Sequence, residues 1–270
     1  IGEEGNCENF SYESFVGGLD IRGMGGLSQY LAVPISKIFK IEGDLSYQEA
    51  ALTEPLSCVV HSIEIADIQL GETVIVIGAG IMGAFHAVLA RNKGARVIIS
   101  EPNQSRIDLM KTLGFEEFIK PDFEDAIDQS LELTDGKGAD VVLSTVGISK
   151  LAEEAVQISS LYGRVVLYSS YHPDTPISIS PNRIHKRMTK LMGSANSNTR
   201  DFITAMKLLN ERVIGVKPFI YGTYELDEIE EAIQKRNDNF YFLTSGKIPP
   251  NPSEMLSSSA MSNLIERLKV

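Results

Sequence analysis

Residues 73–83 read Thr-Val-Ile-Val-Ile-Gly-Ala-Gly-Ile-Met-Gly, a β-branched run that ends in the pattern G-x-G-x-x-G. The β-branched run predicts a buried strand, and the apolar pattern after the glycines predicts a helix. A second apolar run, Arg-Val-Ile-Ile-Ser at 96–100, leads to Glu101, which follows Gly78 by 23 positions (101 − 78). This order of strand, glycine turn, helix, strand and acid is typical of a dinucleotide-binding βαβ unit.

Each part of this unit has a physical role. Gly78 permits a tight turn, Gly80 lets backbone N–H groups approach a pyrophosphate because it has no Cβ, and Gly83 lets the helix pack closely on the sheet. The phosphates then face the positive end of the helix dipole. Glu101 is expected to accept hydrogen bonds from the adenosine ribose and to repel a 2′-phosphate, which favours NAD over NADP. The alternative is a glycine-rich turn without a ligand.

Composition restricts the possible classes of protein. The 270 residues are 43% hydrophobic, enough for one large or two modest domains. Acidic residues outnumber basic ones 36 to 25, and basic residues do not cluster, so nucleic acid and anionic membranes are poor partners. Two cysteines, Cys7 and Cys58, suit a reducing cytoplasm. The chain has no run of 18 apolar residues and opens on Ile1 without a signal segment, so we expect further sequence upstream.

Alternating β-branched and helical patterns between about residues 71 and 196 predict an α/β fold with a doubly wound parallel sheet. Strands are expected at 73–77, 96–99, 117–119, 140–144, 164–168 and 190–192, with helices beginning near Ile81, Gln104, Phe123 and Lys150. Residues 1–50, with a strand-like run at 27–33, resemble the tail of an irregular β domain. Beyond the sheet we expect a helix at 202–209, an extended segment at 216–221, a helix at 226–233, a loop at 244–259 and a final helix at 261–268.

Three motifs follow one another in a familiar order. They are GGLSQYLAVP at 25–34, LTEPLSCVVH at 52–61, and the glycine turn. Together they resemble the zinc-dependent medium-chain dehydrogenase/reductase family, and the Glu-Pro-Leu-Ser run at 54–57 is most similar to its sorbitol (polyol) dehydrogenase branch. The resemblance extends from about residue 7 to residue 233.

The resemblance implies a Rossmann domain and the remnant of a β-rich, GroES-like catalytic domain. Residues 1–53 would be the C-terminal portion of the catalytic domain, 54–66 a linking helix, 67–215 the NAD-binding domain, and 216–270 a return to the catalytic domain with an atypical tail. Family members carry the first zinc ligands and three structural-zinc cysteines upstream of the counterpart of Cys7. Most of the N-terminal catalytic domain is therefore expected to be missing.

The resemblance also implies two metal ligands. Cys7 matches the fourth structural-zinc cysteine, which binds only if the upstream cysteines are present; a free thiol is the alternative. Glu54 matches the carboxylate that completes the catalytic zinc sphere, and its alternative role is that of an acid favoured at a helix N-terminus. Cys58 and His61 are left out of the site as a core cysteine and a helix histidine that the family does not use as a ligand.

Cofactor contacts carried over from the family lie at the ends of the expected strands. Ile81 and Met82 fall at the pyrophosphate turn and Glu101 at the ribose. Arg106 falls at the adenine, although it suits a solvated helix position equally well. The later contacts are Val146, Gly147, Tyr168, Ser169 and Asn196. Asn196 belongs to an Ala-Asn-Ser run that replaces the aromatic-Arg-Tyr run of polyol enzymes, so sorbitol itself is not predicted as the substrate.

The implied activity is NAD-dependent hydride transfer to and from a secondary alcohol, a polyol or a polyol derivative, assisted by zinc in the full-length parent. An NAD(H)-binding module without turnover is the alternative. A methyltransferase is a more distant one, disfavoured by the uninterrupted glycine pattern. Relatives imply a homodimer or homotetramer that pairs through an edge strand, expected here at 216–221.

Overall fold

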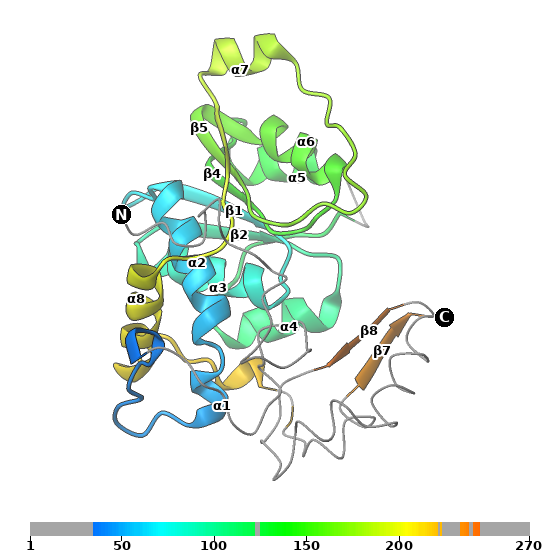
Figure 1. Cartoon of the computed structure of the whole chain (residues 1–270). Helices are drawn as coiled ribbons and strands as arrows, with labels where there is room; N and C mark the ends of the chain where they lie inside the picture. The colour runs from blue at the N-terminus through cyan, green and yellow to red at the C-terminus, as the bar shows by residue number, and fades with distance from the viewer. Residues whose placement is uncertain (1–34, 122–124, 221, 223–232, 238–239, 244–270) are drawn as a thin grey trace. The chain divides into compact units, whose positions relative to one another are not determined.

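The computed structural model describes residues 35–121, 125–220, 222, 233–237 and 240–243 (Figure 1). The expected strand at 27–33, the loop at 244–259, the helix at 261–268 and Cys7 lie outside the described residues. The chain divides into two compact units. Among the described residues, Thr53–Ile214 belong to the first, and residues 35–52 together with those from Gly215 onward belong to the second.

A six-stranded parallel sheet forms the centre of the first unit, in the order β3-β2-β1-β4-β5-β6. The predicted α/β fold with a doubly wound sheet is confirmed. Each predicted strand is present, and most bounds agree within one residue. The strands are β1 Thr73–Ile77, β2 Arg96–Ser100, β3 Phe118–Ile119, β4 Ala139–Ser144, β5 Ser159–Leu167 and β6 Lys190–Gly193.

Strand β1 lies in the middle of the sheet because its side chains are buried on both faces. Ile75 and Ile77 belong to an apolar cluster that includes residues of α5 (Ala126–Leu133) and α6 (Ser149–Gln157). Val74 and Val76 are equally buried and, by strand alternation, face the opposite side. Helices α2 (Thr53–Ala66) and α3 (Ile81–Asn92) pack together, and α3 contacts β1 and β2 (Figure 1).

The helices begin where local capping signals place them. The predicted starts at Ile81 (α3) and Gln104 (α4, Gln104–Thr112) are confirmed. Helix α5 begins at Ala126 rather than near Phe123 because Asp125 caps it, accepting the N–H groups of Ile127 and Asp128. Helix α7 (Pro181–Arg187) was not predicted, although a serine followed by proline at the first helical position is a known start signal.

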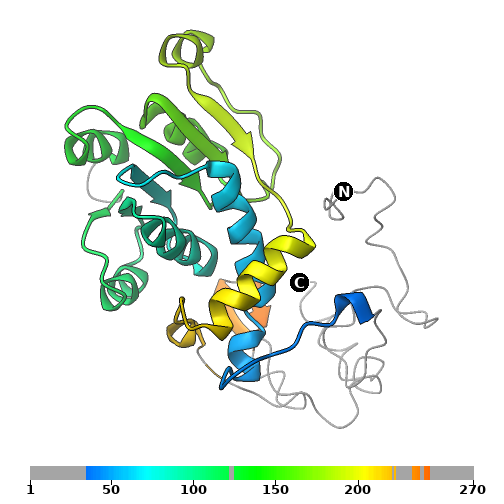
Figure 2. The ribbon, with the colours of Figure 1, turned by 90° about the vertical axis from the view of Figure 1, so that its left-hand side faces the viewer.

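Helices α2 and α8 (Thr199–Asn210) lie side by side in both views (Figures 1 and 2). His61 Nδ1 on α2 lies 2.9 Å from Asp201 Oδ2 on α8, and both side chains are largely buried. The same carboxylate accepts the Asn198 backbone N–H at 2.9 Å, so Asp201 closes a capping box at the start of α8. One acid therefore caps α8 and joins it to α2.

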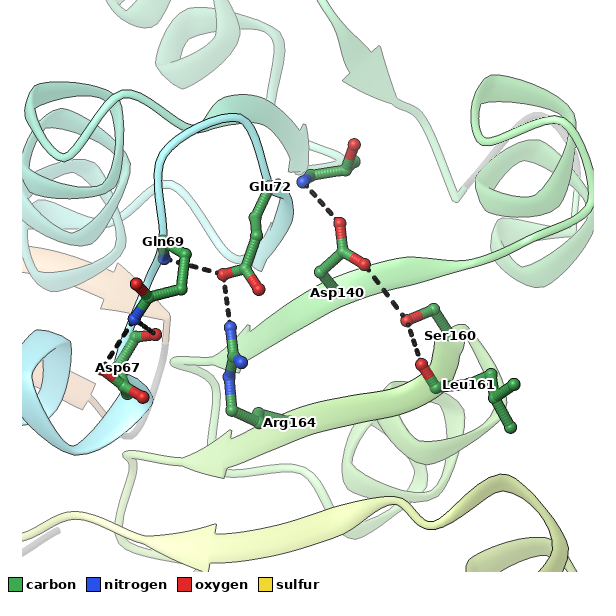
Figure 3. Close-up of polar contacts among 8 residues, drawn as sticks. Asp67, Gln69, Glu72, Asp140, Ser160, Leu161 and Arg164 are labelled. Atoms are coloured by element: carbon green, nitrogen blue, oxygen red, sulfur yellow. Dashed lines mark hydrogen bonds and ion pairs between the residues drawn. The ribbon is translucent and has the colours of Figure 1, made fainter.

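A polar network ties three strands together at their amino-terminal ends (Figure 3). Arg164 on β5 forms an ion pair with Glu72, which also accepts the Gln69 N–H at 2.8 Å. Asp140 on β4 accepts the backbone N–H of Thr73 on β1 at 2.8 Å. The network lies opposite the carboxyl ends of the strands, where ligands bind in folds of this class.

Two expectations about individual segments are wrong. Of the edge strand expected at 216–221, the described residues 216–220 do not form an extended segment, because Lys217–Phe219 is a 3-10 helix (η3) in which Pro218 fixes a helical φ and lacks an N–H for pairing. The sheet edges are β3 and β6. Strand β5 begins at Ser159 instead of Arg164, and Tyr162 within it has φ of 62°, which breaks the alternation that marks a regular strand.

The second unit contains short elements. These are a 3-10 turn (Ile35–Lys37), α1 (Tyr47–Ala50), η3, and an antiparallel pair formed by β7 (Ile233–Asn237) and β8 (Phe240–Leu243). Most of the helix expected at 226–233 lies outside the described residues, and its last residue, Ile233, begins β7. Among the described helices, none is long and apolar enough to cross a membrane.

Candidate functional site

The turns that follow β1, β4 and β5 meet at the carboxyl edge of the sheet. A Cβ on Gly78, after β1, would lie 2.6 Å from Val146 Cγ2, after β4. A Cβ on Gly147 would lie 2.1 Å from the carbonyl oxygen of Ser170, after β5. β1 and β4 are neighbours, but the chain continues from β1 toward β2 and from β4 toward β5, on opposite sides of this pair. The strand order therefore reverses between β1 and β4, and ligands bind at such a switch point in open α/β sheets.

The glycine turn has the geometry that each of its glycines requires. Gly78 has φ of +98°, a conformation that side chains other than glycine rarely adopt. A Cβ on Gly83 would lie 2.0 Å from the carbonyl oxygen of Gly78, so α3 can pack this closely only with glycine there. Chain neighbours and the backbone of α3 aside, no described residue has an atom within 4 Å of a Cβ placed on Gly80. The turn is thus packed tightly on the sheet side and open at the helix start.

The N-terminus of α3 has no side-chain cap. Gly80 is its N-cap residue and offers no side chain to accept the first N–H groups of the helix. Free N–H groups and the positive end of the helix dipole together favour an anion at this end. Ile81, predicted at the pyrophosphate, is partly exposed, and the Met82 carbonyl oxygen accepts a hydrogen bond from His86 Nδ1 at 2.8 Å. The open space at Gly80 and the uncapped helix fit a pyrophosphate.

Glu101 lies at the end of β2, beside the glycine turn. Its Oε2 accepts the backbone N–H of Ala79 at 2.7 Å, and its Oε1 accepts the N–H of Asn103 at 2.9 Å. The residue is only 2% exposed. Arg106, predicted at the adenine, places Nη1 3.4 Å from the same Oε2 with about a third of its side chain exposed. The structure therefore brings Glu101 and Arg106 to the glycine turn.

The remaining predicted contacts follow the other strands at the same edge. Tyr168 and Ser169 come directly after β5, and both are partly buried. Asn196 lies beyond β6, exposed, with φ of 61°. The hydroxyl of its neighbour Ser197 forms a 2.8 Å hydrogen bond with the hydroxyl of Ser57 on α2, which joins this loop to the helix. Sequence reasoning did not find this serine pair.

A polar cluster surrounds Glu54 in the first turn of α2. Cys58 Sγ lies 3.5 Å from Glu54 Oε1, and burial, followed by the charge of Glu54, raises the pKa of the Cys58 thiol to about 11. Burial, followed by the charges of Cys58 and Glu54, also raises the pKa of the Tyr168 phenol. Glu54 and Tyr168, predicted for different roles from distant parts of the sequence, thus belong to one neighbourhood.

His86 is a buried residue of this region that the sequence did not single out. It is fully buried on α3, and its ring makes an edge contact with Tyr168 at a centroid distance of 4.6 Å. Burial lowers the pKa of His86 to about 4, outweighing the hydrogen bond to the Met82 carbonyl. The imidazole is therefore neutral at physiological pH and donates from Nδ1.

A zinc site does not fit the described residues alone. Among them, no group of three or more His, Cys, Asp and Glu side chains lies close enough to hold a metal ion. Structural and catalytic zinc sites take at least three protein ligands, and a thiol must lose its proton to bind zinc. The potential ligand that the described residues place beside Glu54 is the Cys58 thiol, whose raised pKa favours the protonated form.

Comparison with known proteins shows which dehydrogenases the chain is similar to. Residues 82–211 match the family model described as zinc-binding dehydrogenase. A 2-dehydro-3-deoxy-L-galactonate 5-dehydrogenase of Pseudoalteromonas atlantica is 27% identical over 86% of this chain and 66% of its own length. A sorbitol dehydrogenase of Halalkalibacterium halodurans is 29% identical over 77% of this chain and 61% of its own.

A solved structure agrees. A zinc-binding dehydrogenase from Sinorhizobium meliloti 1021, bound to NADP, superimposes with a TM-score of 0.73 and 26% identity over 79% of this chain and 63% of that one. The matched part of the chain is thus similar to zinc-type medium-chain dehydrogenases/reductases, the family that its motifs resemble. It spans less than two thirds of the length of these relatives.

Proposed function

We propose that residues 53–214 bind NAD(H), and that the whole protein transfers a hydride between a secondary alcohol and the nicotinamide ring. One observation carries the proposal. Gly83 packs against Gly78 without room for a Cβ, while the space at Gly80 is open in front of the uncapped helix α3. A tightly packed turn with an open helix start can hold a pyrophosphate against backbone N–H groups, and a βα turn that binds no ligand does not need this open space.

Each residue at the turn has a proposed task. The backbone N–H groups of Ile81 and Met82 bind the pyrophosphate, and the remaining lone pairs of Glu101 accept from the adenosine ribose. The charge of Glu101 disfavours a 2′-phosphate, so NAD binds more tightly than NADP. Arg106 covers the adenine. When bound, NAD supplies the carbon that accepts or returns the hydride.

The other predicted residues are proposed to hold the nicotinamide half. Val146 and Gly147 pass beneath the cofactor, Tyr168 and Ser169 offer backbone groups to the carboxamide, and Asn196 lies at the far side of the ring. Support comes from the contacts that join the turns after β1, β4 and β5 at one edge. These residues orient the cofactor and exclude water from it.

A polyol or a polyol derivative is the proposed substrate class. The names of the galactonate and sorbitol dehydrogenases among the relatives support a small polyhydroxy alcohol. Zinc is proposed for the whole protein on the strength of the family, with Glu54 in its catalytic sphere and Cys7 at a structural zinc completed by further cysteines. The described residues by themselves do not assemble a metal site.

Titration with NADH tests the cofactor proposal directly. The chain contains no tryptophan, so the emission of bound NADH can be followed without protein interference. We expect saturable binding of NADH and weaker binding of NADPH. Glu101→Gln should reduce this preference, and Glu117→Gln, which removes one negative charge from a pair with Arg96 on β2, controls for net charge. Equal or tighter binding of NADPH would contradict the proposed role of Glu101.

The second candidate is an NAD(H)-binding protein without turnover. The glycine turn and Glu101, which form the proposed cofactor site, lie within residues 53–214, and such a protein needs no more than this site. Metal analysis of the purified protein and a panel of polyols with NAD separate the two candidates. Zinc together with NADH production supports the dehydrogenase, whereas NADH binding without metal or turnover supports the binding protein.

Three coarser features complete the proposal. We propose residues 54–66 as the link between an NAD-binding domain at 67–215 and catalytic-domain segments at 1–53 and 216–270. The protein is proposed to act in the cytoplasm as a homodimer or homotetramer. Leu191 on the edge strand β6 is 40% exposed, and an exposed edge of this kind favours pairing with another chain. Analytical ultracentrifugation measures the oligomeric state.

A further inference from the structure

Glu101 makes more contacts with the protein than ribose recognition requires. Both of its carboxylate oxygens accept backbone N–H groups, Oε2 from Ala79 at 2.7 Å and Oε1 from Asn103 at 2.9 Å. The residue is 2% exposed, and its own N–H donates to the carbonyl of Ile119 on β3 at 3.1 Å. A carboxylate buried to this degree is stable only because charged hydrogen bonds replace its water.

Ala79 is the residue between the first two glycines of the turn. Its N–H points at Glu101, so this donor is committed to the protein and is not offered to a ligand. The preceding N–H, that of Gly78, donates to the carbonyl of Ser100 on β2 at 2.8 Å. Two consecutive peptide groups of the turn are thus held by β2 and by the residue that follows it.

The direction of these peptides determines where the next N–H groups point. Gly80 is the N-cap residue of α3 and has no side chain, so the N–H groups of Ile81 and Met82 are proposed to meet the pyrophosphate. Glycine turns are conformationally free, so a turn with glycine at positions 78, 80 and 83 needs an external anchor to keep one shape. The buried Glu101 carboxylate is such an anchor.

We infer that Glu101 is a positioning residue for the phosphate-binding turn, in addition to any contact with the ribose. This inference rests on the proposed NAD(H) site. It assigns two roles to one acid. The first is recognition of the ribose hydroxyls, and some ligands have no such hydroxyls. The second is fixation of the Ala79 peptide, on which the binding of any dinucleotide or nucleoside diphosphate depends. Loss of Glu101 should therefore weaken ligands that have no ribose hydroxyl at all.

The probe that separates the roles is 2′,3′-dideoxy-ADP, which keeps the adenine and the pyrophosphate but has no ribose hydroxyls. In Glu101→Gln the negative charge is lost and one acceptor oxygen becomes an NH2 donor, so the hydrogen bond from the Ala79 N–H is either removed or weakened to a neutral one. We expect this variant to lose roughly fivefold or more in affinity for dideoxy-ADP, measured by displacement of NADH or by calorimetry. In the ligand-free variant, NMR should show faster amide hydrogen exchange at Ala79.

Controls make the outcome decisive. Glu117→Gln removes a carboxylate that pairs with Arg96 and should keep wild-type affinity for dideoxy-ADP. If Glu101→Gln does not fold, Glu101→Asp keeps the charge but withdraws the carboxylate by one methylene, and the same loss is expected. Unchanged dideoxy-ADP affinity with weakened NADH affinity overturns the inference and leaves the proposed function standing. If the wild-type protein binds neither ligand, the proposed function fails, and the inference fails with it.

Discussion

The Cα of Gly83 lies so close to Gly78 that a Cβ there would come within 2.0 Å of the Gly78 carbonyl oxygen. This contact joins the first turn of α3 to the end of β1 and shapes the opening in which a pyrophosphate is proposed to lie. At Gly80, three residues earlier, a Cβ would meet no atom of the described residues within 4 Å, apart from chain neighbours and the backbone of α3. The protein therefore constrains Gly83, whereas the proposed ligand is what would require glycine at position 80.

The first prediction uses this difference. Gly83→Ala should lower the free energy of unfolding by about 1–3 kcal/mol, because the backbone must shift to admit the methyl group. Gly80→Ala should leave stability nearly unchanged and reduce NADH affinity, because its methyl group would enter the proposed phosphate position. Urea unfolding and NADH titration on both variants measure the two effects. A Gly80→Ala protein that binds NADH normally would place the pyrophosphate elsewhere.

The second prediction concerns pH. Because burial lowers the pKa of His86 to about 4, the unfolded chain binds a proton below its ordinary pKa of about 6.5 that the folded chain does not. Stability should therefore fall as the pH drops from about 6.5 to 4, by a total on the order of 3 kcal/mol from this group. Unfolding measured at pH 7.5 and pH 5 should show a smaller decrease in His86→Phe than in wild type.

His185→Phe, at an exposed position of α7, controls for the loss of a histidine as such. The difference between the two variants isolates the buried imidazole. Identical pH dependence in wild type and His86→Phe would show that His86 does not resist protonation in the folded protein.

The third prediction concerns the ion pair between Glu72 and Arg164 (Figure 3). Both side chains are at most 20% exposed, so a double-mutant cycle with Glu72→Gln and Arg164→Met should give a coupling of roughly 1–2 kcal/mol. The pair Lys207 and Glu211 on α8, separated by 3.8 Å and mostly exposed, should couple by less than about 0.5 kcal/mol. Equal couplings would mean that burial does not strengthen the first pair.

The fourth prediction concerns Asp201, which caps α8 and pairs with His61. Asp201→Ala removes both interactions and should cost about 2–4 kcal/mol, the sum of a lost cap and a lost buried partner. Asp128→Ala, in the first turn of α5 but exposed, should cost less than about 1 kcal/mol. Thermal unfolding measures the loss of stability in both variants. Similar losses would mean that Asp201 contributes no more than an exposed acid in the first turn of a helix.

The sheet could be predicted because each of its central strands is a short, continuous apolar run. Strand β1 and the start of α3 have the bounds that the sequence indicates, since the glycine turn marks the transition between them. The errors have local causes. Pro218 favours a 3-10 helix in a segment whose apolar residues indicate a strand. The left-handed backbone conformation of Tyr162 interrupts the strand pattern, so the first half of β5 cannot be recognised from the sequence.

The site could be predicted only in part. Residue type and spacing place Glu101 beside the glycine turn, but they do not tell which donors occupy its oxygens. Ala79 and Asn103 occupy them through backbone N–H groups, which every residue except proline has and which no sequence pattern marks. The contact between His86 and Tyr168 is hidden for a similar reason, because it joins α3 to the end of β5 across the fold.

The uncapped start of α3 also has a practical consequence. Its unpaired N–H groups will attract any small oxyanion in solution, including the sulfate and phosphate of common buffers. Such ions would compete with a nucleotide and make its affinity appear weaker than it is. Nucleotide binding to this protein is therefore best measured in an amine buffer with chloride as the anion. Phosphate can then be added as a competitor.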